Sequence, residues 1–350
     1  MDGICYLNII PEEITKYIIS LTKNKVYDLC LINHYFNDNC KTIKIVDNFK
    51  YPKITDINFK ELINLTSLGL FKNNIITDEG IKDLINLTSL DLSRNKKITN
   101  KGIKGLINLI SLDLSLNNKI TDEGIKGLIN LIYLDLTNND IITDEGLKEL
   151  VNLTSINLDY NTKITNKGIG GLINLSYLNL FRNNKITDEG IKELINISSF
   201  NLSCNNMITV KGIIRLINLT SLDLSSNNII TNKGIKELTK LTHLNLLNNK
   251  IITNKAIKKL INLTSLDLYY NENITDEAIK GLTNLTSLNL CENYKITNEG
   301  MKELTSLITL NLESNNIIKD EGIKKLINLT SLNSLNLCYN DNITDKKINL

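Results

Sequence analysis

Few side chains in this sequence have the types and spacing that catalysis or metal binding requires. The 350 residues include two histidines, His34 and His243, and six cysteines that show neither a CxxC spacing nor a disulfide framework. Catalysis needs titratable groups that lie together and are driven into unusual protonation states, and the sequence contains no such constellation. The run Gly168-Ile169-Gly170-Gly171 resembles part of a phosphate-binding loop, but its glycines only replace Lys and Glu of a recurring segment. We therefore expect a protein that is not an enzyme, with no catalytic residue, no metal site and no cofactor.

Protein binding is the chemistry that the sequence does allow. Aromatic and arginine side chains contribute much of the energy of protein interfaces. Two groups of such residues, with their neighbours, interrupt a background of Ser, Asp and Asn: Tyr133, Tyr160, Tyr177, Phe181 and Arg182, and then His243, Leu247, Tyr269, Tyr270, Cys291 and Glu292. We predict that these groups contact a target protein; the alternative is neutral variation.

The residues that position these groups belong to a 22-residue repeat. Its first clear copy is Leu65 to Asn86, LTSLGLFKNNIITDEGIKDLIN, and twelve copies follow one another without insertion or deletion as far as Asn328. Self-similarity at a short fixed period is typical of a solenoid. Positions are counted below from the first residue of each copy, which is Leu in all copies but the one that opens at Ile197.

Each copy combines two hydrophobic periods. Apolar residues at positions 4 and 6 alternate with polar ones and predict a short strand. Positions 17, 20 and 21, as in Ile81, Leu84 and Ile85, have helical spacing and predict two turns of helix. Thr77, at position 13, is the expected N-cap, and the acidic residues after it favour the helix dipole.

Two further positions indicate how the copies stack. Asn occupies position 9 in all twelve copies and can satisfy backbone groups where the strand bends. Position 16 is Gly, or Ala at Ala256 and Ala278, which indicates a close approach of neighbouring coils. Because strands pack about 4.8 Å apart and helices about 8 to 10 Å, we predict a curved α/β solenoid with its parallel sheet on the concave face.

Strand positions 3, 5, 7 and 8 should then face the concave side or its rim. Position 5 is Asp or Asn from the second copy onward, and this polar ladder either docks a peptide backbone or is simply solvated. On the opposite side, Glu and Lys mix at position 15, as in Glu79, Lys101 and Glu123. We expect ion pairs between neighbouring coils there, each contributing at most about 1 kcal/mol.

The pattern LxxLxLxxN followed by ITDEGIKxL resembles the leucine-rich repeat family. The strand half, as in Leu112 to Asn117, is shared by all such repeats, and the ITDEG half is similar to the cysteine-containing and ribonuclease-inhibitor-like branches. The resemblance implies a protein-interaction module.

Residues 1–42 do not follow the repeat. Pro11 with two acidic residues is a good helix start, and two further short helices are expected up to Cys40. The segment resembles an F-box, although F-boxes often carry a Trp where this chain has Tyr35 and Phe36. The resemblance implies binding to the adaptor of a cullin-type ubiquitin ligase through Ile10, Pro11, Ile14, Ile18, Leu29, Ile32 and Phe36. The alternative is a helical cap that shields the first strand.

We thus predict three parts: an F-box-like helical unit over 1–42, a degenerate capping repeat over 43–64, and a solenoid over 65–350 whose last repeat is partial and follows a three-residue shift after Leu329. The predicted function is target recognition for a ubiquitin ligase, with the helical unit on the adaptor and the repeats on the target. The alternative is a scaffold or decoy. A surface adhesin is disfavoured because the N-terminus lacks a secretory signal.

Charge and composition limit the partners. The 40 basic and 38 acidic residues give a net charge of +2 and no basic patch, so we expect no nucleic acid and no membrane partner. We expect a monomer outside the complex, in the cytoplasm or the nucleus. The abundance of Ile, Asn and Lys suggests an AT-rich genome, such as that of a giant virus, with the host cytoplasm as location, or of a protist.

Overall fold

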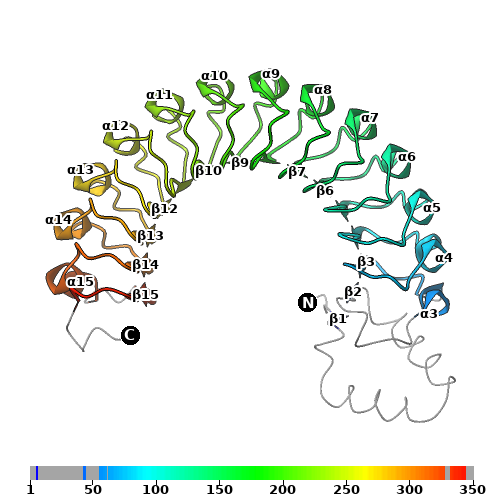
Figure 1. Ribbon diagram of the computed structural model, residues 1–350, viewed down its shortest axis with the longest axis horizontal. Helices are drawn as coiled ribbons and strands as arrows, with labels where there is room; N and C mark the ends of the chain where they lie inside the picture. The colour runs from blue at the N-terminus through cyan, green and yellow to red at the C-terminus, as the bar shows by residue number, and fades with distance from the viewer. Residues whose placement is uncertain (1–4, 7–41, 45–54, 61, 328–331, 344–350) are drawn as a thin grey trace, which may run out of the picture. The chain divides into compact units, whose positions relative to one another are not determined.

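A computed structural model describes residues 5–6, 42–44, 55–60, 62–327 and 332–343, in two units that span 1–175 and 176–350. In each unit, parallel strands follow one another in chain order and short helices lie on the opposite face of the coils (Figure 1). The strands of each unit line its concave side, as the repeat pattern predicts.

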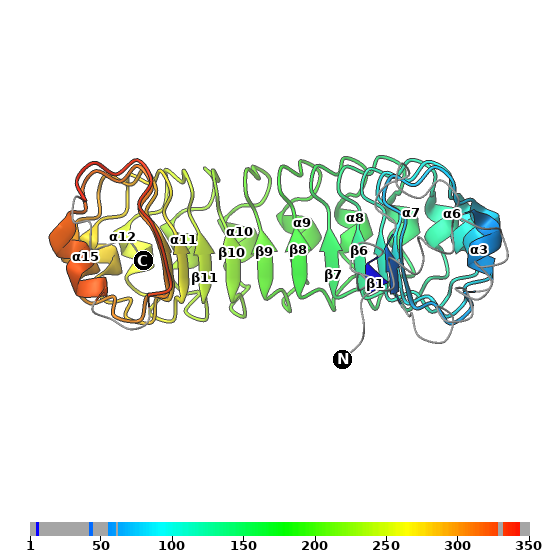
Figure 2. The same cartoon turned by 90° about the horizontal axis from the view of Figure 1, so that it is seen from below.

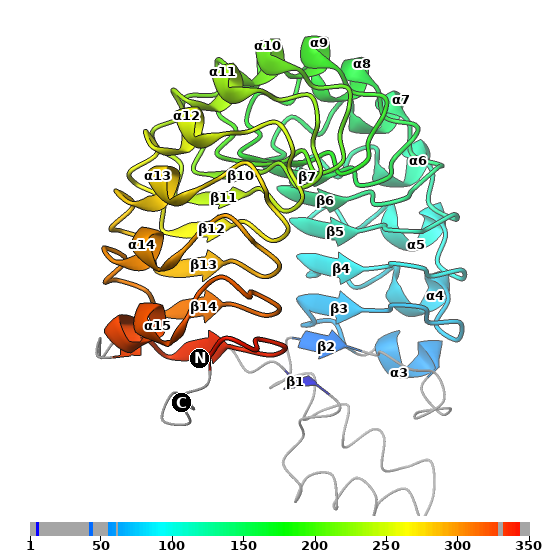
Figure 3. The ribbon, with the colours of Figure 1, turned by 60° about the vertical axis from the view of Figure 1, so that its left-hand side comes forward.

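The first unit contains these described strands and helices: β1 (Cys5–Tyr6), β2 (Thr42–Lys44), α3 (Asp56–Lys60), β3 (Ser67–Gly69), α4 (Asp78–Ile81), β4 (Ser89–Asp91), α5 (Asn100–Ile103), β5 (Ser111–Asp113), α6 (Asp122–Ile125), β6 (Tyr133–Asp135), α7 (Asp144–Leu147), β7 (Ser155–Asn157) and α8 (Asn166–Ile169). Figure 3 shows β3 to β6 stacked in this unit, with α4 to α6 across the coil from them.

The second unit contains β8 (Tyr177–Asn179), α9 (Asp188–Ile191), β9 (Ser199–Asn201), α10 (Val210–Ile213), β10 (Ser221–Asp223), α11 (Asn232–Ile235), β11 (His243–Asn245), α12 (Asn254–Ile257), β12 (Ser265–Asp267), α13 (Asp276–Ile279), β13 (Ser287–Asn289), α14 (Asn298–Met301), β14 (Thr309–Asn311), α15 (Asp320–Ile327) and β15 (Ser334–Asn336).

The hydrophobic core of both units is a set of stacked aliphatic layers. Each copy buries its described residues at positions 1, 4, 6, 12 and 17 almost completely, and position 20 is buried likewise from the first to the eleventh copy; Leu87, Leu90, Leu92, Ile98 and Ile103 illustrate this in the second copy. Burial of these side chains is the main stabilising contribution of each coil. The sequence prediction for these positions is confirmed.

The helices are shorter than predicted. From α4 to α14 each helix covers four residues. The prediction of two helical turns from the spacing of Ile81, Leu84 and Ile85 is therefore wrong. After Ile81 the chain makes a tight turn in which the amide of Leu84 donates to the carbonyl of Ile81 at 3.0 Å. This turn buries Leu84 and leaves Ile85 57% exposed, because 22 residues leave no room for a second helical turn before the next strand.

The asparagine at position 9 binds backbone groups of its own and the preceding coils. Nδ2 of Asn205 donates to the carbonyls of Leu180 and Asn183 at 3.0 and 2.9 Å, and its Oδ1 accepts from the amides of Met207 and Ile208, both at 3.0 Å. The residue before each asparagine is left-handed, with φ between 47° and 55° from Lys72 to Tyr339. The predicted role of Asn is confirmed.

A second polar ladder joins the helix starts. Thr99 caps α5 by accepting from the amide of Lys101 at 3.3 Å, as predicted, but it also binds the preceding coil. Its amide and hydroxyl donate to the two carboxylate oxygens of Asp78 at 2.7 and 2.6 Å. The acidic residue after the N-cap therefore links two coils, in addition to its favourable place at the helix dipole.

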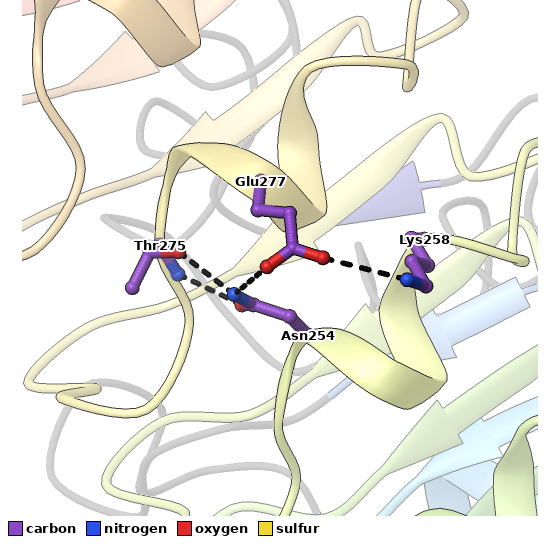
Figure 4. Close-up of polar contacts among 4 residues, drawn as sticks. All are labelled: Asn254, Lys258, Thr275 and Glu277. Carbon is purple, nitrogen blue, oxygen red and sulfur yellow. Dashed lines mark hydrogen bonds and ion pairs between the residues drawn. The ribbon is translucent and has the colours of Figure 1, made fainter.

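Asn can replace Asp in this ladder. Oδ1 of Asn254 accepts from the amide of Thr275 at 3.0 Å, and its Nδ2 donates to the Thr275 hydroxyl at 2.7 Å (Figure 4). The same amide nitrogen of Asn254 lies 3.4 Å from one carboxylate oxygen of Glu277. The other carboxylate oxygen of Glu277 lies 3.4 Å from Nζ of Lys258. The proximity of the coils also explains position 16, since a Cβ on Gly102 would lie 2.6 Å from Oδ1 of Asp78.

In the part of the chain that the structure describes, the predicted ion pairs between position-15 residues of neighbouring coils are absent, although Glu277 at position 15 pairs with Lys258 of the preceding coil. Among the described residues, most ion pairs run within one coil from position 15 to position 18, as in Glu79 with Lys82 at 2.7 Å. Lys82 holds the pKa of Glu79 below its usual range, and both side chains are exposed. Ion pairs between coils also form, as in Lys258 with Glu277 at 3.4 Å and Lys259 with Glu237 at 4.0 Å.

The register changes by three residues at both ends of the regular array. Thr309 pairs with Ser334, 25 residues later, which confirms the predicted shift near the C-terminus. Thr42 likewise pairs with Ser67, so the strand of the degenerate repeat begins three residues before the place that a constant frame predicts. β1, which pairs with β2, was not predicted within the helical segment 1–42.

Candidate functional site

The strand face of the second unit contains a shallow depression of ≈ 350 Å³ over β8 to β12, which we call the trough. Figure 2 shows these neighbouring strands from β8 to β11. The small polar residues that line the trough come from positions 3 and 5, namely Ser199, Ser221, Ser265, Asn201, Asn245, Asp223 and Asp267. Positions 3 and 5 face away from the core because the side chains of positions 4 and 6 fill it.

Two large side chains limit the trough. Tyr177 and His243 occupy position 3 in β8 and β11, whereas β9 and β10 carry Ser199 and Ser221 there. Three strand spacings separate the two rings, which corresponds to about 14 Å. The depression therefore lies partly between these two side chains, over the small residues of β9 and β10, and it continues beyond His243 to Ser265 and Asp267 of β12. The sequence prediction that Tyr177 and His243 belong to the target-binding surface remains a proposal, but both line this trough.

The trough carries negative charge. Asp223 and Asp267 are half-buried, and Lys and Arg are absent from the lining. Oδ1 of Asp223 accepts from the amide of Ser225 at 2.8 Å, and its Oδ2 accepts from Nδ2 of Asn245 at 3.2 Å. Asp267 makes equivalent bonds to the amide of Tyr269 and to Asn289. These bonds fix the carboxylates while leaving them accessible to a ligand.

Position 5 has a structural role that neither sequence interpretation included. In the first unit, Oδ1 of Asp91 accepts from the amide of Ser93 at 2.8 Å, and Asp113 and Asp135 bind the residue two positions later in the same way. Such an Asx turn closes the end of each strand. The position-5 side chains are therefore not simply solvated. Because one oxygen of each already accepts a backbone hydrogen bond, that oxygen is not free to dock a peptide backbone.

Asp113 lies between two other carboxylates, because β4, β5 and β6 place Asp91, Asp113 and Asp135 in register. Burial raises the pKa of Asp113, and the neighbouring Asp135 and Asp91 raise it further, against the hydrogen bonds from Ser115. The like charges of the neighbouring strands therefore add to the effect of burial on this carboxyl group.

Other predicted residues of the second unit lie at the turn that follows the strands, beside the trough. The Arg182 guanidinium lies 5.3 Å from the centre of the Phe181 ring, and Leu247 is half-buried at the equivalent turn of the ninth copy. The Tyr269 hydroxyl donates to a Glu292 carboxylate oxygen at 3.3 Å, and the charge of Glu292 raises the pKa of Tyr269. Tyr270 is exposed.

Cys291 lies at the same turn, where burial and nearby carboxylates raise its pKa to about 11. A thiol with that pKa stays protonated at neutral pH and is a poor nucleophile. Groups of three or more His, Cys, Asp or Glu that could hold a metal ion are absent from the described residues.

The predicted target-binding residues of the first unit are Tyr133 and Tyr160. The Tyr133 hydroxyl donates to Oδ2 of Asp135 at 3.2 Å, on its own strand, and Tyr160 is exposed in the left-handed turn that precedes Asn161. The adaptor-binding residues proposed from the sequence, Ile10, Pro11, Ile14, Ile18, Leu29, Ile32 and Phe36, lie outside the described residues.

Sequence reasoning missed the polar lining of the trough. The selection of aromatic and basic outliers passed over Ser199, Ser221, Asp223 and Asp267, although the position rule already placed them on the strand face. Small residues between large ones are a signal of a depression that position-by-position comparison could have found.

Repeated parallel strands and an asparagine ladder define a solenoid of stacked coils. The leucine-rich repeat family matches the chain in nine stretches, and these cover more than half of it: 61–85, 83–107, 105–129, 127–151, 171–195, 215–239, 259–282, 281–304 and 303–326. The chain belongs to the leucine-rich repeat family, and its repeats form a protein-interaction module of a kind that typically lacks enzymatic activity.

Solved structures of several leucine-rich repeat-like solenoids are similar to this chain. An internalin (InlF) from Listeria monocytogenes is 27% identical, with a TM-score of 0.53, over 72% of this chain and 82% of its own. A chain of the yeast Rad7–Elc1 complex is 18% identical, with a TM-score of 0.56, over 92% and 96%. A chain of the Drosophila Toll–Spätzle complex is 18% identical, with a TM-score of 0.56, over 87% and 40%.

A comparison with curated protein sequences finds no match. Among the described residues, no helix has the length and apolar character that a membrane span requires.

Proposed function

We propose that this chain is a target-recognition subunit of a cullin-type ubiquitin ligase, in which the trough binds a target protein and the F-box-like segment binds the adaptor. The observation that carries the first half is the trough itself, a built depression with rings at two sides and fixed carboxylates at its floor. Such a surface suits binding better than chemistry because its titratable groups are held apart by Ser and Asn.

The trough offers an extended segment of the target two kinds of contact. The Tyr177 and His243 rings can bury apolar side chains of the target, in the manner of interface hot spots. Between them, the Asn201 and Asn245 amides can bind polar groups of the target backbone. Phe181, Arg182, Leu247, Tyr269, Tyr270 and Glu292 would contact the target at the rim, and Tyr133 and Tyr160 would do so in the first unit.

The second half of the proposal rests on the sequence of residues 1–42. An F-box-like segment directly before leucine-rich repeats is the domain order of target receptors, and a chain in the yeast Rad7–Elc1 complex shares the fold of the repeats. We further propose that the chain divides into the helical unit 1–42, the capping repeat 43–64 and the solenoid 65–350, and that it binds no cofactor. A scaffold or decoy, in which 1–42 only caps the solenoid, is the competing function.

The target half is tested with a Tyr177→Ala/His243→Ala double variant of the full chain. Target recovery from cells, quantified by mass spectrometry against the unmutated chain, should fall at least about tenfold, since two hot-spot rings are removed. Tyr294→Ala is the control, because Tyr294 is an exposed aromatic residue that lies outside the trough. Equal loss in both variants, or in neither, would contradict the assignment of the trough.

The adaptor half is tested with a Pro11→Ala/Ile14→Ala double variant. Adaptor and cullin subunits should be recovered with the unmutated chain and lost with the variant, while thermal stability and target recovery stay unchanged. If no adaptor is recovered with either protein and the variant melts earlier, the segment is a cap and the scaffold function is correct.

A further inference from the structure

Isoleucine or valine at position 21 is exposed in most described copies, as in Ile85 and Val151, but in the first unit two neighbouring copies add an exposed isoleucine at position 2. Ile107 and Ile110 are 56% and 42% exposed, and Ile129 and Ile132, at the same positions of the next copy, are 49% and 43% exposed. We call these four residues the edge patch. Leu106, Leu109, Leu128 and Leu131 fill the core beside them, so the edge patch does not contribute to it.

The two halves of the edge patch lie on adjoining turns. The amide of Ile132 donates to the carbonyl of Ile110 at 2.8 Å, and Nδ2 of Asn130 donates to the carbonyl of Ile107 at 3.0 Å. The backbone beside the isoleucines is thus hydrogen-bonded within the protein. The edge therefore exposes apolar side chains to solvent. Exposed apolar side chains that cluster in this way mark interaction sites.

The fold does not need isoleucine at these positions. Residues 104–110 and 126–132 both read KGLINLI, whereas residues 280–286 read KGLTNLT and form the same turn. There, Nδ2 of Asn284 donates to the carbonyl of Ile261 at 3.0 Å, and the Thr286 hydroxyl adds a hydrogen bond to the carbonyl of Thr264 at 3.0 Å. At position 2, isoleucine gives up this bond and exposes apolar surface, so the fold does not require Ile110 or Ile132.

The charged residues within the two turns that carry the edge patch are all basic. Lys104 and Lys126 are exposed and have no ion-pair partner among the described residues. Neither 104–110 nor 126–132 contains an acidic residue, while the corresponding turns before and after them carry Asp83 and Glu149. We propose that the edge patch binds a segment of a partner protein in which apolar side chains are accompanied by carboxylates. This surface is separate from the trough and does not depend on the function proposed for it.

A protein segment fits this surface better than a lipid surface does. Each basic residue near an anionic membrane contributes about 1 kcal/mol, so two lysines give weak attraction. The isoleucines are held on a hydrogen-bonded ladder of coils, which is a firm surface for complementary packing.

The test uses a displayed library of random peptides, selected on the full chain. Peptides enriched in Asp or Glu together with Leu, Ile or Phe should emerge. Their affinity, measured with synthetic copies by fluorescence anisotropy, should fall at least tenfold for the variant Ile107→Thr/Ile110→Thr/Ile129→Thr/Ile132→Thr. This variant gives both turns the sequence of 280–286, so its melting temperature should stay within a few degrees of the unmutated chain.

A second variant, Lys104→Glu/Lys126→Glu, tests the charge independently of the isoleucines. It should weaken the acidic peptides at least tenfold in low salt, with a smaller loss in high salt because screening reduces the attraction. Peptides that bind all three proteins equally, or that carry no excess of acidic residues, would overturn the proposal.

Two other occupants are distinguished by parallel measurements on the same variants. A dimer in light scattering that becomes a monomer in the threonine variant would assign the edge patch to a second copy. Sedimentation with phosphatidylserine vesicles that is lost in that variant would assign it to a membrane. Either result would overturn the proposal, and neither would affect the Tyr177 and His243 test of the trough.

Discussion

At the scale of the residue, most polar side chains of the repeat complete backbone hydrogen bonds. The asparagine at position 9 and the Asp or Asn at position 5 both bind the amide two residues later, as in Asn205 with Met207 and Asp223 with Ser225. A buried backbone group without a partner costs about 1 to 3 kcal/mol, so these side chains are as necessary to the fold as the leucines.

Replacing Asn205 by Leu should lower the free energy of unfolding by at least about 3 kcal/mol, because four backbone groups lose their partner. Chemical denaturation measures this loss. The adjacent Asn206 is exposed, and Asn206→Leu should change the free energy of unfolding by less than about 0.5 kcal/mol. Similar effects of the two substitutions would contradict the asparagine ladder.

Asp113→Asn should stabilise the protein at neutral pH by about 0.2 to 1 kcal/mol, because it removes a like charge between two neighbours. Asn keeps the turn, as Asn157 does at the same position. The pKa of Asp113 is raised in the folded state, so its ionisation costs stability: the fold loses stability as pH rises through that pKa.

The gain from Asp113→Asn should therefore be present at pH 7 and disappear below about pH 4, where the carboxyl is protonated in folded and unfolded chains. Thermal melts of both proteins across this range measure it. A gain that is independent of pH would show that charge is not the cause.

At the scale of the element, four-residue helices cannot be stable by themselves, since a helix in water needs many more residues than one turn. They are held by buried residues at positions 16 and 17 and by the ladder between helix starts. In that ladder, the amide and hydroxyl of Thr165 donate to Asp144 at 2.8 and 2.6 Å.

Asp144→Ala should lower the free energy of unfolding by about 1 to 3 kcal/mol, because two donors lose a charged acceptor. Glu145, the next residue, is a matched control because its side chain is exposed and its ion pair with Lys148 is long, at 3.8 Å. Glu145→Ala should cost less than about 0.5 kcal/mol. Equal losses in urea denaturation would mean that both carboxylates act only through the helix dipole.

At the scale of the whole molecule, each coil contacts mainly the coils before and after it. The free energy of unfolding is then a sum of similar contributions from each coil and each interface between coils. For the fold, the number of copies is less important than the alignment of strand with strand and helix with helix in neighbouring coils.

Deleting the complete copy Leu65 to Asn86 should therefore leave a protein that unfolds cooperatively, because Asn64 then precedes Leu87 as it now precedes Leu65. Deleting half a copy, Leu65 to Ile75, should destroy the fold of the adjoining coils, since strand residues would meet helix residues of the next coil. Circular dichroism melts distinguish the two. Cooperative unfolding after both deletions would contradict a stack in phase.

The sequence by itself determined the repeat, the buried positions, the asparagine ladder and the short strands. These follow from local physics: a strict period places every apolar residue of one position in one layer, and only a stacked coil buries all layers at once. Resemblance added the family, which the comparisons confirm, and the F-box-like segment, which stays a prediction.

Tertiary structure decided what depends on neighbouring coils. The second helical turn disappears because the next strand begins too soon, and Asp78 binds Thr99 rather than serving its own helix alone. The trough depends on the register that places Ser199 and Ser221 between Tyr177 and His243, and the edge patch depends on Ile110 and Ile132 lying on adjoining coils. Contacts between residues 21 to 23 apart are set by the pitch of the coil, which no single copy encodes.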